Sequence, residues 1–279
     1  MTASPSAPSP SLAGLDLDTP YALNPDDIAR FRQDGFIRLP AVFSAEELAA
    51  IDGVLTPLTL AEAPETDLED RNTYGKAFIQ VGNLWEKAQD AKTITFSKRL
   101  ARIATELLGT AGVRLYHDQC LYKEAGGGFT PWHVDQQYWP MDSPLSVTAW
   151  FPFQATTLDM GPLCFGKGSH LRKIGRELEI SDESERLIQA EVKKQKIVEI
   201  YEPYGLGDVS FHYGWTLHRA GPNTSDKPRK VHTVIYMDQD MKLIEPKTQA
   251  HRNDWNNWTP STKVGEVMDD PKNPVLYSA

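Results

Sequence analysis

Cysteine is scarce in this chain, and long apolar runs are missing from it. The 279 residues include two cysteines, Cys120 and Cys164, which are far apart and form none of the short Cys/His spacings that bind metal ions. We therefore expect two buried free thiols in a reducing compartment rather than a disulfide. No apolar stretch approaches the roughly 20 residues that a membrane-spanning helix requires, so we expect no membrane partner.

Positive charge is also in deficit. The 29 lysines and arginines are outnumbered by 38 aspartates and glutamates, which leaves a net charge of −9. Because nucleic-acid binding needs a basic face, we expect no nucleic-acid partner. The first basic residue is Arg30, so the N-terminus lacks the positive start of a secretory signal. These features predict a cytoplasmic protein and leave the oligomeric state open.

The chain is expected to divide into a short tail and one large domain. Residues 1–23 begin with a stretch rich in Ser, Pro and Ala, which predicts a disordered N-terminal tail. Residues 24–279 are long enough to bury a single large core. Within them, residues 24–110 are expected to be helical support. The signals are an Asn24-Pro25 helix start, a capping box at Ser44–Glu47 for a helix to about Val54, and a helical run over Lys98–Leu108.

Residues 111–240 have a different pattern, which is typical of a β-rich core. Short runs of alternating β-forming residues are separated by Gly/Pro turns. We predict strands over Val113–Lys123, Leu145–Gln154, Ile197–Tyr201, Val209–Phe211 and Val231–Met237. Many short strands after a helical first part predict a mainly β fold with flanking helices, a double-stranded β-helix or jelly roll.

Two further segments are expected to lie outside the strands of this core. Residues from about 171 to 196 are dense in charge, which predicts a helical insertion with a solvated face. Residues 241–279 are expected to form a C-terminal lid that contains Trp255 and Trp258.

The candidate metal ligands are His133, Asp135 and His218. On a strand, positions i and i+2 point to the same side, so His133 and Asp135 can face one ion while Val134 faces away. His218 is expected near the end of a later strand. Two imidazoles and one carboxylate can occupy one face of an Fe(II) ion and leave the other face open for a cosubstrate and O₂.

Arg229 is a candidate anion-binding group. Its guanidinium can clamp a carboxylate by a two-point, charge-assisted contact. Together with the three metal ligands, it predicts an iron- and 2-oxoglutarate-dependent oxygenase. Other histidines have no neighbouring motif that indicates a metal ligand. His170 is expected to be structural, and His212 and His232 are expected to pack within strands.

Four linked motifs follow one another in a specific order. They are FRQDGFIRLP at residues 31–40, PWHVDQQYWP at 131–140, GPL with GSH between 161 and 170, and HRAGPN at 218–223 with Arg229. In this order the motifs resemble the phytanoyl-CoA dioxygenase family of Fe(II)/2-oxoglutarate oxygenases, over about residues 26 to 240. The resemblance implies that His133, Asp135 and His218 bind Fe(II) and that Arg229 holds the distal carboxylate of 2-oxoglutarate.

The resemblance also implies roles for two more residues. Lys123 matches a lysine that contacts 2-oxoglutarate in related hydroxylases, and Trp150 matches a tryptophan that lines the cosubstrate. Ala220 departs from the pattern, because relatives often carry a serine there whose hydroxyl assists the carboxylate. One hydrogen bond to 2-oxoglutarate is therefore expected to be missing.

The expected reaction is hydroxylation of an unactivated C–H bond with release of succinate and CO₂. Desaturation, epoxidation and ring closure stay open, because the placement of the substrate decides the product. The candidate substrate contacts are His117, Gln119, Gln137 and Tyr138. The aromatic and amide character of this region favours a small metabolite or natural-product intermediate over a CoA thioester as the small-molecule partner.

Two other functions stay open from the sequence. The first is a metal-dependent barrel enzyme without 2-oxoglutarate, such as a cupin-type dioxygenase or isomerase, in which Arg229 and Lys123 would have no clamp to form. The second is a non-catalytic binding protein on the same fold, which would be expected to have lost part of the ligand set. Formation of succinate from 2-oxoglutarate without added substrate separates the oxygenase from both.

Overall fold

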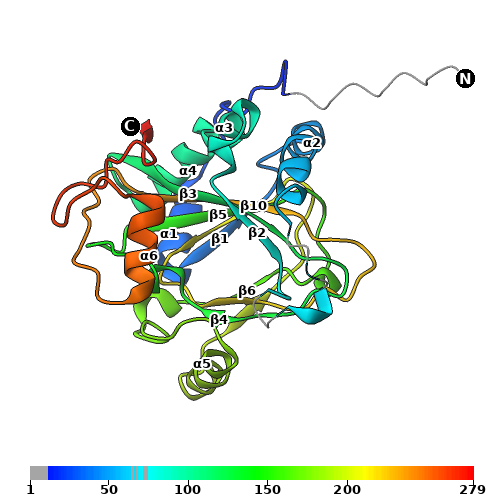
Figure 1. The fold of residues 1–279 in the computed structure, drawn as a ribbon, viewed down its shortest axis with the longest axis vertical. Coiled ribbons are helices and arrows are strands. Elements are labelled where there is room, and N and C mark those ends of the chain that lie inside the picture. The colour runs from blue at the N-terminus through cyan, green and yellow to red at the C-terminus, as the bar shows by residue number, and fades with distance from the viewer. Residues whose placement is uncertain (1–11, 64–65, 67, 72–74) are drawn as a thin grey trace, which may run out of the picture.

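Two antiparallel β-sheets lie face to face at the centre of the molecule (Figure 1). This computed structural model describes residues 12–63, 66, 68–71 and 75–279. In that part of the chain, the larger sheet has seven strands in the order β1-β8-β5-β10-β3-β11, with β2 also paired to β3, and the smaller sheet has the order β4-β9-β6-β7. The strands are β1 (Phe36–Leu39), β2 (Ile79–Gly82), β3 (Gly112–Tyr122), β4 (Thr130–His133), β5 (Ser146–Pro152), β6 (Leu163–Gly166), β7 (Glu199–Tyr201), β8 (Val209–Tyr213), β9 (His218–Ala220), β10 (Val231–Asp238) and β11 (Val275–Ser278). This arrangement confirms the predicted mainly β jelly roll with flanking helices.

Helices cover the outer sides of both sheets (Figure 1). They are α1 (Pro25–Asp34), α2 (Ala45–Leu60), α3 (Gln89–Thr95), α4 (Lys98–Leu108), α5 (Asp182–Lys194) and α6 (Gln249–Trp258). Helices α1 to α4 pack with the larger sheet, whereas α5 packs on β4 of the smaller sheet. Helix α5 falls within the segment that the sequence predicts to be a helical insertion. None of the helices in the described residues has the length and apolar character that crossing a membrane requires.

Side chains point alternately to the two faces of the larger sheet, and these two faces differ in character. On β8, Val209 and Phe211 belong to the main hydrophobic core under the helices, so Ser210 and His212 point toward the smaller sheet. On β5, Phe151 packs in the same helix-side core while its neighbour Trp150 packs with side chains of the smaller sheet. The helix side therefore carries most of the apolar packing, and the side between the sheets is left for polar side chains.

Helix α2 is longer than the sequence predicts. Its capping box forms as expected, since the Ser44 side chain accepts a hydrogen bond from the Glu47 backbone N–H and the Glu47 carboxylate accepts one from the Ser44 N–H. The helix then continues past Pro57 to Leu60 instead of ending near Val54. Proline removes one hydrogen bond from the helix. We attribute the extension to the burial of Leu55 and Thr59, both fully buried, on either side of it.

The predicted tail is too long at its C-terminal end. Residues 1–11 lie outside the described residues, but residues 12–23 pack on the start of α4. Leu12 and Leu17 are buried, and the Arg99 guanidinium donates hydrogen bonds to the backbone carbonyls of Asp16 and Thr19, each at 2.8 Å. The sequence pattern does not reveal this order, because it depends on contacts with Arg99 some 80 positions further along the chain.

The predicted C-terminal lid is in part a piece of the sheet. Strand β11 pairs antiparallel with the first residues of β3, so the last residues of the chain extend the larger sheet. Helix α6, by contrast, contributes Asp254 and Trp258 to the wall of the cavity between the sheets. That the remainder of residues 241–279 acts as a lid stays a prediction.

Candidate metal centre and pocket

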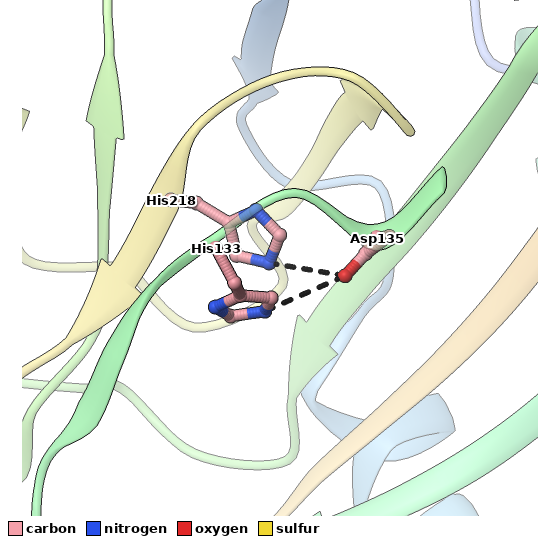
Figure 2. A group of neighbouring side chains, drawn as sticks. All are labelled: His133, Asp135 and His218. Carbon is pink, nitrogen blue, oxygen red and sulfur yellow. Dashed lines mark ion pairs between the residues drawn. The ribbon is translucent and has the colours of Figure 1, made fainter. Parts of the chain in front are cut away.

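His133, Asp135 and His218 come together where the smaller sheet is paired between β4 and β9 (Figure 2). His133 is the last residue of β4, and the register of the sheet places it directly opposite His218. Asp135 follows two residues later, at the start of a 3₁₀ turn over Asp135–Gln137. His218 begins β9 rather than ending a strand, which corrects that detail of the prediction. The three residues converge because the end of β4 and the start of β9 are paired side by side in the smaller sheet.

The three side chains present their ligand atoms to one point. One oxygen of Asp135 lies 3.5 Å from Nε2 of His133 and 3.5 Å from Nε2 of His218, and the ligand atoms all lie within 4.8 Å of one another. The Nδ1 atoms of His133 and His218 donate to the backbone carbonyls of Pro131 and Thr216, at 2.8 and 3.0 Å. Because Nδ1 carries the proton, the Nε2 lone pairs are free to bind a metal ion.

The second oxygen of Asp135 has its own partners in the larger sheet. The Thr148 hydroxyl and His212 Nε2 each lie 3.3 Å from it. The sequence predicts only that His212 packs within a strand. In the structure His212 also contacts Asp135, a candidate metal ligand. These contacts hold the carboxylate so that its first oxygen is left for the ion, as outer-shell partners of metal ligands commonly do.

The charge states of the group suit a divalent cation. Burial opposes ionisation of Asp135, but the neighbouring imidazoles, His218 foremost, hold its pKa well below its usual value. Burial, together with the neighbouring His133, holds the pKa of His218 well below its usual value. An anionic Asp135 beside a neutral His218 is the protonation pattern that a metal ion requires of such ligands.

Arg229 and Trp150 form a second polar group in the same pocket. The Arg229 guanidinium is fully buried, lies 5.3 Å from the centre of the Trp150 ring and donates from Nη1 to the Gly161 carbonyl. Burial lowers its pKa to about 10, so it remains a cation at neutral pH. Within the described part of the chain, Arg229 Nε and Trp150 Nε1 are buried without any hydrogen-bond acceptor. Buried donors of this kind are normally satisfied, so an anionic ligand such as a carboxylate fits here.

A cavity of about 400 Å³ between the two sheets joins these groups. Its wall includes all three candidate ligands together with Arg229 and Trp150. Its other side chains include several aromatic and aliphatic residues, namely Phe78, Leu121, Tyr138, Trp139, Leu163, Ile180, Ile235 and Trp258. This volume lies within the usual range for a small-molecule site.

The predicted substrate contacts are only partly on the cavity wall. His117, Gln119 and Tyr138 line the cavity, but Gln137 does not. Gln137 is buried beside α6, where its carbonyl accepts a hydrogen bond from His251. The 3₁₀ turn after Asp135 explains the difference, since it carries Gln137 away from the strand direction.

Lys123 lies next to Arg229 but not among the residues that line the cavity. The backbones of the two residues exchange hydrogen bonds of 2.9 and 2.8 Å, and the Lys123 ammonium donates to the Gly128 carbonyl. Burial and the nearby Arg229 lower the pKa of Lys123 to about 6. A contact between Lys123 and 2-oxoglutarate therefore stays a prediction.

Thr148, His212 and Asp254 line the cavity and are absent from the predicted set of site residues. A signal for the first two exists in the sequence, because Thr148 lies two residues before Trp150 and His212 alternates with the core residue Phe211. Asp254 lies four residues before Trp258 and so shares its face of α6.

Comparisons with known proteins agree with this geometry. The sequence model of the family described as phytanoyl-CoA dioxygenase matches residues 31–231. The chain is similar to the non-heme alpha-ketoglutarate-dependent carbocyclase SnoK from nogalamycin biosynthesis, with 24% identity and a TM-score of 0.74 over 91% of this chain and 97% of that chain. It is also similar to the epimerase SnoN in complex with Fe3+, alpha-ketoglutarate and nogalamycin RO, with 25% identity and a TM-score of 0.74 over 90% and 98% of the two chains. A third similar structure is EctD from S. alaskensis with 2-oxoglutarate and 5-hydroxyectoine, with 21% identity and a TM-score of 0.65 over 83% and 84%.

Proposed function

The chain belongs to the phytanoyl-CoA dioxygenase family, and on this premise we propose that it is an Fe(II)- and 2-oxoglutarate-dependent oxygenase that hydroxylates a small molecule. One observation carries the proposal: the His133/Asp135/His218 group and the buried, incompletely paired Arg229 line the same cavity. The first group fits a metal ion and the second fits a carboxylate. SnoN, which is similar over most of its length, has been crystallised with iron and alpha-ketoglutarate, which is 2-oxoglutarate.

Different residues of the cavity would bind the metal ion and the cosubstrate. His133, Asp135 and His218 would hold Fe(II), and three protein ligands on one face leave the other face for 2-oxoglutarate and O₂. Arg229 would pair with the distal carboxylate of 2-oxoglutarate, with the Trp150 indole as a further donor. When bound, iron, 2-oxoglutarate and O₂ supply the oxidising power for the C–H bond, with succinate and CO₂ as coproducts.

The surrounding side chains prepare the cavity for this chemistry. Thr148 and His212 keep the Asp135 carboxylate oriented before any ligand arrives. The apolar and aromatic wall excludes water and holds the substrate, so that the distance of one C–H bond from iron decides the product. Ala220 also lines the cavity; it offers no hydroxyl to the distal carboxylate, which leaves Arg229 as the principal clamp.

Hydroxylation is the outcome that we propose for this chain. It requires only that a C–H bond lies near the metal, whereas ring closure or epimerisation also needs a second substrate group or a hydrogen donor held in place. The family relatives SnoK and SnoN are described as a carbocyclase and an epimerase, so analysis of the product by mass spectrometry has to accompany any turnover assay. A mass increase of one oxygen atom is the expected result.

The test is O₂-dependent conversion of 2-oxoglutarate to succinate by the Fe(II)-loaded protein. Asp135→Ala should lower the rate at least about tenfold through loss of metal binding. Asp142→Ala is the matched control, because Asp142 is an exposed carboxylate seven positions along the chain that contacts the Lys242 backbone. Equal succinate formation by the wild type and Asp135→Ala would contradict the proposal. Bound iron without any succinate would favour a metal enzyme that does not use 2-oxoglutarate.

A further inference from the structure

Asp254 is a carboxylate on the cavity wall without a positive partner. It projects from α6 into the wall, is half-buried, and accepts a hydrogen bond from the Tyr116 hydroxyl at 3.2 Å. The Trp258 side chain also donates a hydrogen bond to this carboxylate, so both of these partners are neutral side chains, and none of the ion pairs found among the described residues includes Asp254. A carboxylate removed from water without a counter-charge is costly. A ligand that brings the missing positive charge would offset this cost.

The neighbouring histidine does not supply that charge. The His117 ring lies against the Trp258 ring, with centroids 4.5 Å apart and planes at 19°, and Trp258 shares a helix face with Asp254. Burial lowers the pKa of His117 to about 4, so the ring is neutral at physiological pH. Burial also raises the pKa of Asp254 to about 7, as expected for a carboxylate that lacks a cation.

Aromatic side chains surround this carboxylate within the same cavity. Tyr138, Trp139 and Trp258 all line the wall, and the His117 ring lies edge-on to Trp139 with the planes at 84°. Aromatic faces attract cations, and ammonium groups are recognised by such faces combined with a carboxylate. The wall near α6 therefore has both elements of an ammonium site.

The charged side chains that line the whole cavity also favour a cationic ligand. Beyond the candidate metal ligand Asp135, the described lining residues include two acids, Asp254 and the exposed Glu179, but Arg229 is their single lysine or arginine. Arg229 is assigned to 2-oxoglutarate. The Ile180 backbone N–H donates to the Tyr138 hydroxyl at 2.7 Å, which places the neighbouring Glu179 beside Tyr138 on this wall. Anionic substrates, including the phosphates of a CoA thioester, would meet two acidic side chains there and no second lysine or arginine.

We propose that the substrate carries a protonated amine, which binds to Asp254 against the aromatic faces of Trp258 and Tyr138. This inference rests on the proposed oxygenase function, since it names the class of molecule that the same cavity would oxidise. Asp254 would then act as a specificity-determining residue: it fixes the charged end of the substrate and thereby selects which C–H bond approaches the metal.

The test compares two probes of equal shape and different charge. Benzyltrimethylammonium and its neutral isostere neopentylbenzene are titrated by calorimetry into the protein loaded anaerobically with Fe(II) and 2-oxoglutarate, and also into the metal-free protein. The wild type should bind the cation at least about tenfold more tightly than the neutral compound. Asp254→Asn, which keeps shape and removes charge, should abolish this preference, whereas Asp269→Asn, at an exposed carboxylate away from the cavity wall, should retain it.

The outcomes separate this inference from the proposed function. Equal affinity for the two probes, no binding of the cation, or an unchanged preference in Asp254→Asn would overturn the ammonium site. If the same protein still converts 2-oxoglutarate to succinate, the oxygenase assignment stands without it. If the charge preference is present but no succinate forms, the ammonium site stands and the oxygenase assignment fails.

Discussion

Replacement of Arg229 is predicted to weaken 2-oxoglutarate binding by two to three orders of magnitude. The guanidinium is fully buried, and its Nε has no acceptor among the described residues. A hydrogen bond to a charged group contributes about 1.5–3 kcal/mol. Loss of two such bonds at the lower end of this range costs about 3–4 kcal/mol, or about 10²- to 10³-fold in Kd. Arg229→Gln removes the charge at moderate change of volume. Arg229→Lys retains the charge without the planar guanidinium, so its affinity for 2-oxoglutarate should lie between those of the wild type and Arg229→Gln.

The assay is a titration of the Fe(II)-loaded protein with 2-oxoglutarate under anaerobic conditions, followed by the KM for 2-oxoglutarate in succinate formation. Lys230→Gln is the matched control, because Lys230 is the next residue, carries the same charge and pairs with Asp52 at 2.7 Å away from the cavity wall. Thermal unfolding must be measured in parallel, since Arg229 also donates to the Gly161 carbonyl. A folded Arg229→Gln protein with wild-type affinity for 2-oxoglutarate would refute the role of this residue.

Three further results are expected. His212→Gln should lower Fe(II) affinity about tenfold or more by loosening Asp135, measured by anaerobic metal titration, and unchanged affinity would show that the 3.3 Å contact is incidental. Because the pKa of Asp254 is raised to about 7 in the folded protein, the stability that its protonation contributes is present below about pH 4 and lost as the pH rises through 7. Asp254→Asn should therefore unfold at a higher temperature than the wild type at pH 8, with a gap that narrows toward pH 5, and a gap independent of pH would contradict this. Gly161→Ala should lower the unfolding temperature, at a cost of about 1–3 kcal/mol, and should raise the KM for 2-oxoglutarate. Gly161 has a φ of 68° and a Cβ there would meet the Gly221 carbonyl, so wild-type stability and KM would argue against both effects.

The fold and the grouping of the candidate metal ligands could be predicted because local sequence patterns indicate them. The H-x-D spacing places His133 and Asp135 on one side because Val134 keeps an extended backbone, although the strand itself ends at His133. The Gly/Pro turns and alternating runs are sufficient to predict the two-sheet architecture. The pairing of His133 with His218 depends on the register between β4 and β9, which the sequence motif suggests but only the fold demonstrates.

The remaining features depend on tertiary packing, which the sequence pattern does not encode. His212 looks like any strand histidine until β8 places it beside Asp135. Gln137 comes two residues after Asp135, yet the 3₁₀ turn over Asp135–Gln137 takes it away from the cavity wall. Residues 12–23 are ordered by carbonyl acceptors that fit Arg99, a contact between segments some 80 positions apart in the chain.

The central claim is tested most directly by the visible absorption band that appears when 2-oxoglutarate chelates Fe(II). The anaerobic wild-type protein is expected to develop this band on addition of both components, whereas His218→Ala, which removes one of the three converging candidate ligands, should not. The exposed-site variant Asp142→Ala should behave like the wild type. A wild-type protein that binds iron but shows no band with 2-oxoglutarate would contradict the account.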